Sequence, residues 1–155
     1  MRRLAPRATH VRVVRWLRPT RTVPGWVVAL MRAAVTLWAT LVFVQPVLAG
    51  QFLDGNEELV EVHGMNANVV LVAALAMLVA AVLLWRPGRG AAWPAGASAL
   101  LVMVSLAQAL LGDAGLLAVH VPLGVLLFGS AVGMLSWVWS RRIRVRRPGT
   151  AVPAG

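Results

Sequence analysis

Long apolar runs dominate this chain, and they predict helices that cross a membrane. A transmembrane helix needs about 20 mostly apolar residues to cross a hydrocarbon layer about 30 Å thick. Four runs meet that requirement, and the connections between them are too short to hold a soluble domain. The sequence therefore predicts an all-α, polytopic membrane protein with a transmembrane bundle over residues 26–139. Its predicted spans are residues 26–48, 63–85, 93–111 and 116–139.

The composition indicates a lipid bilayer as the solvent. The 155 residues are 59% apolar and only 13% charged, and the mean hydropathy is +0.77. A soluble chain carries about 25% charged residues, so the class of soluble domains is excluded. The chain has no Cys, which excludes disulfides, thiolate metal sites and iron–sulfur clusters.

The charged residues predict the orientation in the membrane. All basic residues are Arg; seven precede residue 26, two lie between the second and third spans, and five lie in residues 141–147. Because basic residues beside membrane segments stay on the cytoplasmic side, we expect Arg-rich cytoplasmic tails over residues 1–25 and 140–155 and a location in the cytoplasmic membrane of a prokaryote. The remaining one, Arg32, lies inside the first span and is expected to extend toward the lipid headgroups. The acidic residues fall in the two opposite connections: Asp54, Glu57, Glu58, Glu61 and Asp113.

The formal charge of +10 does not indicate a nucleic-acid partner. Nucleic-acid binding needs a folded basic face with side chains that read or stack on bases. Apart from Arg32, the Arg residues lie in the tails and one short loop, so anionic lipid of the bilayer is the expected contact.

The first two spans resemble the last two, which predicts two repeated helical hairpins. Gln45, in the run Gln-Pro-Val-Leu-Ala-Gly, corresponds to Gln108, in the run Gln-Ala-Leu-Leu-Gly. His63 then corresponds to His120, and each His is followed by an apolar run that ends in Trp and Arg. Such hairpins would be related by a pseudo-twofold axis along the membrane normal. A chance similarity of apolar runs is the alternative.

Two His residues are the candidates for chemistry. His63 opens the 63–85 span and His120 lies about one turn into the 116–139 span, so both imidazoles are expected in the outer leaflet, at depths about 4.5 Å apart. A neutral imidazole binds metal and haem iron, so the pair predicts a haem b held by His63 and His120 for electron transfer or haem handling. Gln45 and Gln108 would either accept a ring N–H from these ligands or form ordinary interhelical hydrogen bonds.

The sequence also allows functions other than haem binding. The Ser residues of the last two spans lie away from Asp54 and Asp113, no phosphate-binding loop is present, and a non-catalytic protein is favoured over an enzyme. A cofactor-free membrane accessory or scaffold protein is the first alternative, and a small transporter component is the second. Gly129 and Gly133 form a G-x-x-x-G pattern that would allow a homodimer or contact with another membrane protein. Pro122 either kinks the last helix or occupies its first turn.

These features resemble one four-helix half of the haem A synthase family. The resemblance covers roughly residues 26–139 and rests on the His at the head of the second span, the His in the fourth span and the repeated hairpin. It implies that His63 and His120 are axial haem ligands. The E-x-x-H-R pattern of that family is absent, because Gly64 follows His63, so haem hydroxylation is not carried over. The chain is equally similar to small uncharacterised four-helix membrane proteins of actinobacteria, which implies no activity.

Overall fold

The computed structural model describes residues 23–140, and this part of the chain is built from four α-helices. Each helix is long and apolar enough to cross a membrane. The predicted all-helical fold is therefore confirmed for the described residues, with four helices that are long and apolar enough to span a membrane. The predicted tails lie outside the described residues, apart from residues 23–25 and 140. The helices are α1 (Gly25–Leu53), α2 (Leu59–Trp85), α3 (Trp93–Asp113) and α4 (Leu117–Trp139).

The first two helices run past their apolar spans. α1 continues to Leu53 and α2 already begins at Leu59, so His63 lies in the second turn of α2 instead of opening it. Two glycines make the short connections 54–58 and 114–116 feasible, because Gly55 has a φ of 105° and Gly115 a φ of 67°. Residues with a Cβ rarely adopt such left-handed conformations.

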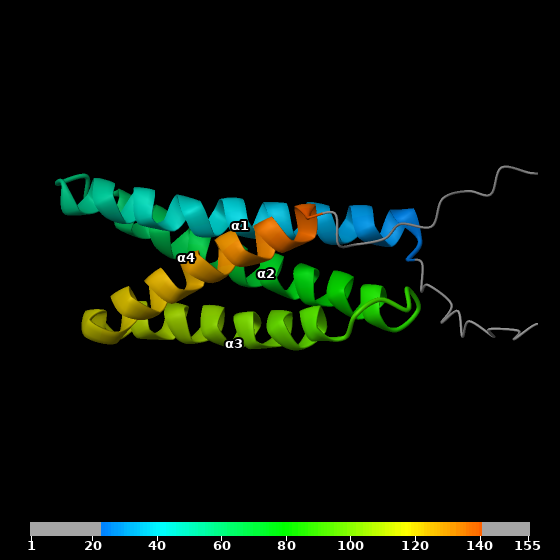
Figure 1. Cartoon of the computed structure of the whole chain (residues 1–155). Helices are drawn as coiled ribbons and strands as arrows, with labels where there is room; N and C mark the ends of the chain where they lie inside the picture. Colours follow the sequence, from blue (N-terminus) through cyan, green and yellow to red (C-terminus); the bar gives the residue numbers. More distant parts are fainter. Residues whose placement is uncertain (1–22, 141–155) are drawn as a thin grey trace, which may run out of the picture.

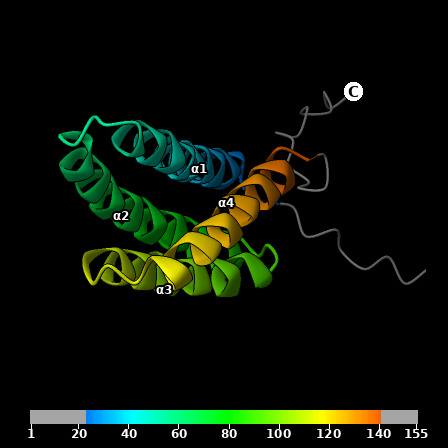
Figure 2. The ribbon, with the colours of Figure 1, turned by 90° about the vertical axis from the view of Figure 1, so that its left-hand side faces the viewer.

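The four helices form a ring in which α1 packs on α2, α2 on α3, and α4 on both α3 and α1. Figures 1 and 2 show that α4 crosses obliquely, starting beside α3 and ending beside α1. We call the end of the bundle that holds connections 54–58 and 114–116 the two-loop end. The opposite end, which holds connection 86–92 together with Val23 and Ser140, is the terminal end.

The hydrophobic core is concentrated away from the two-loop end. On α1, residues spaced by three and four, such as Met31, Val35 and Trp38, are buried with no more than 1% of their surface exposed. Such spacing places side chains on one helical face. Within the described chain, no hydrophobic residue of 43–69 or 106–126 is buried. The pair α1 and α2 therefore diverges from the pair α3 and α4 at the two-loop end, which carries the two candidate His residues (Figures 1 and 2).

Two helices, α1 and α4, contain an internal proline, and in both it lies in the half of the helix nearer the two-loop end. Pro46 lies inside α1 and Pro122 inside α4. Because α4 begins at Leu117, Pro122 lies beyond the first turn, and the interpretation that it occupies that turn is wrong. A proline at this position has no N–H to donate to the carbonyl four residues earlier, which weakens the helix locally.

The end of α2 depends on the absence of a side chain at Gly88. The Gly88 N–H donates to the Leu83 carbonyl at 2.9 Å, and a Cβ at Gly88 would lie 2.6 Å from the Leu84 oxygen and 2.8 Å from the Leu83 oxygen. Since backbone atoms cannot move aside like a flexible side chain, we expect Gly88→Ala to lower the stability by about 1–3 kcal/mol. Thermal unfolding in detergent measures this. Gly96→Ala is the control, because nothing lies within 4 Å of its added Cβ; equal midpoints for both variants would contradict the prediction.

Candidate functional site

His63 and His120 approach each other across the two-loop end. His63 comes from α2 and His120 from α4, two helices on opposite corners of the ring. Their ring centroids are 6.3 Å apart, with an angle of 55° between the ring planes. Both side chains are half-buried. The structure thus brings together the two residues that the sequence singles out.

The orientation of the His120 ring is fixed by α3. Its Nδ1 donates to the backbone carbonyl of Gln108 at 3.0 Å. Because a carbonyl oxygen only accepts hydrogen bonds, Nδ1 must carry the proton. In the neutral ring the lone pair then lies on Nε2, which is the arrangement of an imidazole that binds a metal through Nε2.

Two glycines allow α3 and α4 to interlock around this hydrogen bond. A Cβ at Gly112 of α3 would lie 3.1 Å from Cε1 and 3.2 Å from Nδ1 of His120. A Cβ at Gly124 of α4 would lie 2.9 Å from Nε2 of Gln108. Each helix therefore places a polar side chain against a glycine of the other helix, and these close contacts restrict where His120 can lie.

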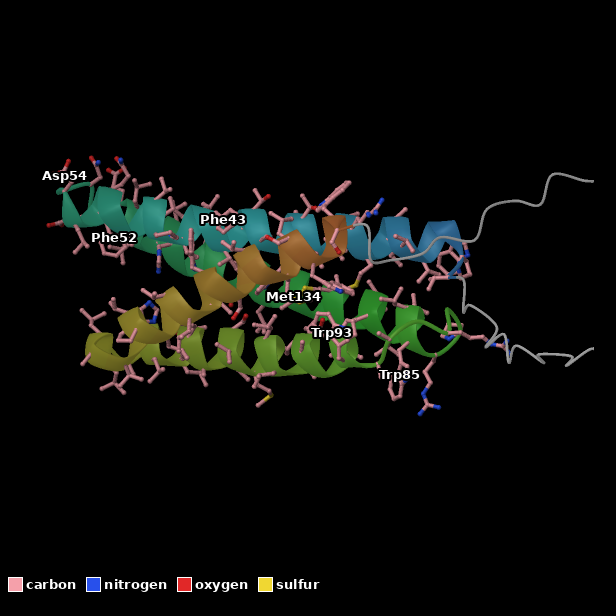
Figure 3. The ribbon with its side chains drawn as sticks, in the orientation of Figure 1. Phe43, Phe52, Asp54, Trp85, Trp93 and Met134 are labelled. Atoms are coloured by element: carbon pink, nitrogen blue, oxygen red, sulfur yellow. The ribbon has the colours of Figure 1, made fainter. Side chains whose placement is uncertain are left out.

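His63 is surrounded by residues of α1. Phe52 contacts it edge-on, with ring centroids 5.5 Å apart and an interplanar angle of 84°. The backbone of Gln45 lies beside the ring, but Nδ1 of His63 is buried without a hydrogen-bond partner. Figure 3 shows Phe52 on the side of α1 that faces the rest of the bundle, at the two-loop end where Asp54 also lies.

The side-chain oxygens of the two candidate Gln residues accept no hydrogen bond within the described residues. Oε1 of Gln45 and Oε1 of Gln108 are both buried with no hydrogen bond. Gln108 contacts His120 through its backbone carbonyl and not through its side chain. Nδ1 of His63 is also unpaired, so three buried polar atoms without a partner belong to the candidate residues Gln45, His63 and Gln108. Buried polar atoms are nearly always paired, so this set requires an explanation.

The other polar residues of the first turns of α2 have separate roles. Nδ2 of Asn66 donates to the Leu41 carbonyl of α1 at 3.0 Å. Asn68 instead bonds the Gly64 carbonyl of its own helix at 3.3 Å. The Asn66 side chain therefore links α2 to α1 by a hydrogen bond about one helical turn after His63. Sequence spacing leaves this contact undetermined, because it depends on how α1 and α2 are rotated against each other.

The residues present fit a haem better than a bare metal ion. Within residues 23–140, no group of three or more His or carboxylate side chains could hold an ion, whereas a bare zinc site takes at least three protein ligands. A haem iron needs only axial ligands from the protein. The ring centroids of His63 and His120 are 6.3 Å apart, which is close enough for one metal with metal–nitrogen distances of about 2 Å to lie between the rings.

Arg32 is held by α4 at the terminal end, a contact that the sequence does not indicate. Its Nε donates to the Val138 carbonyl at 3.2 Å, and its guanidinium carbon lies 4.9 Å from the centre of the Trp139 ring. Val138 is in the last turn of α4, where carbonyls lack intrahelical partners and a positive charge is favourable. The side chain is therefore bound by protein groups in addition to any contact with lipid headgroups.

No family model matches the chain, and neither a curated protein nor a solved structure is significantly similar to it.

Proposed function

We propose that this protein is a membrane cytochrome that binds one haem b between His63 and His120. The observation that carries the proposal is the pair of imidazoles 6.3 Å apart in the one part of the described bundle that lacks buried hydrophobic residues. A flat apolar macrocycle there would cover the diverging helix faces and contribute the core that the side chains do not form.

The protein's own residues would set the properties of this site. A bound haem supplies one-electron redox chemistry. The Gln108 carbonyl holds the proton on Nδ1 of His120. This bond would make Nε2, the other ring nitrogen, a more basic ligand for a metal. Phe52 packs edge-on against His63 and would cover part of that ring. The chain has no Cys to form thioether bonds, so the haem would be held without covalent attachment.

Electron transfer is the use that we favour, with haem handling as the second. If His63 and His120 both bound the iron, the protein would leave it no ligand position for a substrate. A bis-imidazole site therefore suits electron exchange with a membrane partner better than catalysis at the metal. Haem handling would instead require one of the two ligands to be released readily.

Visible spectroscopy of the full chain tests the proposal. The protein is expressed with haem supplied, purified in mild detergent and measured in the oxidised and reduced states. A stoichiometric Soret band and sharp reduced α and β bands are expected for a low-spin cytochrome. A colourless protein would contradict the proposal and leave a cofactor-free accessory or scaffold protein as the better reading.

The contact between Gly112 and His120 provides a finer test. In Gly112→Ala the new Cβ would lie 3.1 Å from the His120 ring. We expect the imidazole to shift by a few tenths of an ångström, which would lengthen its hydrogen bond to the Gln108 carbonyl. We expect haem to dissociate up to about tenfold faster and the reduction potential to change. Gly96→Ala is the matched control on the same helix, α3, since nothing lies within 4 Å of its added Cβ. Identical dissociation rates for the two variants would remove Gly112 from this role.

The membrane orientation belongs to the same proposal. With both termini cytoplasmic, as the Arg distribution indicates, the two-loop end and the haem would face the outer side of the cytoplasmic membrane. The hairpin repeat is supported by the places of the corresponding residues: Gln45 and Gln108 lie on α1 and α3, and His63 and His120 lie near the start of α2 and α4.

Self-association is a further part of the proposal. Gly129 and Gly133 lie on the exposed side of α4, with nothing within 4 Å of an added Cβ. Small residues four apart let helix backbones approach closely. A second copy or another membrane protein could therefore pack on this face without disturbing the His pair.

A further inference from the structure

An open groove runs along α1 at the terminal end of the bundle, far from the His pair. Its volume is about 840 Å³, and it lies between α1 and the end of α4. Its lining extends from Gly25 to Thr40, which is about 22 Å along the helix axis. That length exceeds the half-thickness of a hydrocarbon layer, about 15 Å. The groove is mostly apolar and includes Val28, Ala29, Ala33 and Leu37.

One cation lies in this apolar groove. Arg32 and Trp139 both line it, and the Nε1–H of Trp139 donates to the Thr36 hydroxyl at 3.2 Å. The indole is thereby fixed under the guanidinium. Among the described residues, the only hydrogen bond of Arg32 uses Nε, which leaves the terminal N–H groups available for an acceptor.

The chain itself supplies no carboxylate side chain to Arg32. All five acidic side chains lie in or beside the two connections of the two-loop end. Asp54 is 22 residues along α1 from Arg32, or about 33 Å. A charged side chain within a membrane-spanning helix normally pairs with an opposite charge or with backbone carbonyls. Arg32 has the Val138 carbonyl as a partner, but no acidic side chain of the chain lies near its terminal N–H groups.

We propose that this groove binds an anionic phospholipid. The lipid phosphate accepts hydrogen bonds from the free N–H groups of Arg32, while one acyl chain lies along Ala29, Ala33 and Leu37. A planar guanidinium matches phosphate oxygens in pairs, and an indole prefers the interfacial depth at which phosphates lie. This site does not depend on the proposed haem.

Lipid binding to the full-length chain tests the site. The purified protein is depleted of lipid in detergent and titrated with phosphatidylglycerol or phosphatidylcholine that carry the same acyl chains. Native mass spectrometry then measures the bound fraction of each lipid. The wild-type protein is expected to prefer phosphatidylglycerol, and Arg32→Gln is expected to lower this preference about fivefold. Arg86→Gln is the matched control, because Arg86 is at the same end but stacks on Trp85.

A second variant tests the acyl-chain part without changing any charge. Ala33 is exposed in the groove, and Ala33→Phe would fill it and reduce the binding of both lipids. Val72→Phe is its control, since Val72 is 65% exposed on α2 and lies outside the groove. Ala33→Phe also keeps the proposal testable if Arg32→Gln fails to fold.

Three results would overturn the proposal. The first is an unchanged lipid preference in Arg32→Gln, and the second is an equal loss in Arg86→Gln, which would indicate general surface electrostatics. The third is a stoichiometric second polypeptide that Arg32→Gln releases while lipid binding stays the same, which would make the counter-charge a protein carboxylate.

Discussion

Replacing either His63 or His120 by Ala should abolish the low-spin haem spectrum. Each substitution removes one of the two imidazoles that face each other at 6.3 Å. We expect the amount of haem retained after purification to fall at least about tenfold and the sharp α band to disappear. Visible spectra of the reduced proteins, normalised to protein concentration, measure both effects.

His10→Ala is the control for this experiment. It is the third His of the chain and lies outside the described residues, so it should leave the spectrum unchanged. A His63→Ala, His120→Ala double variant that still binds haem stoichiometrically would show that these residues are not the ligands. Circular dichroism of each variant must report an unchanged helix content, because a global loss of fold would also release haem.

The sequence predicts which residues form the candidate site, but not how they are held. Two His residues in otherwise apolar spans are conspicuous, because polar groups are rare at membrane depth. The bond from His120 to Gln108 uses a backbone carbonyl, which every residue possesses. No residue pattern can therefore indicate it. The role of Gly112 is equally hidden, since in a Gly-rich chain its contact with the ring follows only from the packing of α3 on α4.

The fold is more predictable than the site, for a physical reason. Hydrocarbon forces every backbone N–H and C=O to be paired within the chain, so a long apolar run can hardly be anything but a helix. The oblique path of α4 and the divergence at the two-loop end depend on side-chain packing among similar apolar residues. Arg32 illustrates the difference: its depth follows from its position in the sequence, whereas its bond to Val138 requires the end of α4 to lie beside α1.

Trp38→Ala should be the most destabilising single substitution in the core. Trp38 is fully buried on α1 with 0% exposure and is the largest of the fully buried side chains, so its removal leaves a large cavity. Aromatic-to-Ala changes of this kind cost about 3–5 kcal/mol, and the loss should appear in chemical or thermal unfolding in detergent.

Two further variants separate packing from other effects at this position. Leu37→Ala, at the adjacent and 56% exposed residue, should change stability by less than about 0.5 kcal/mol. Trp38→Phe tests the polar contribution, because Nε1 of Trp38 is buried without a partner. Since Phe has no unpaired donor to bury, it should recover much of the stability that Ala loses. If Trp38→Ala and Leu37→Ala unfold at the same midpoint, the α1 face that carries Trp38 does not form the core described above.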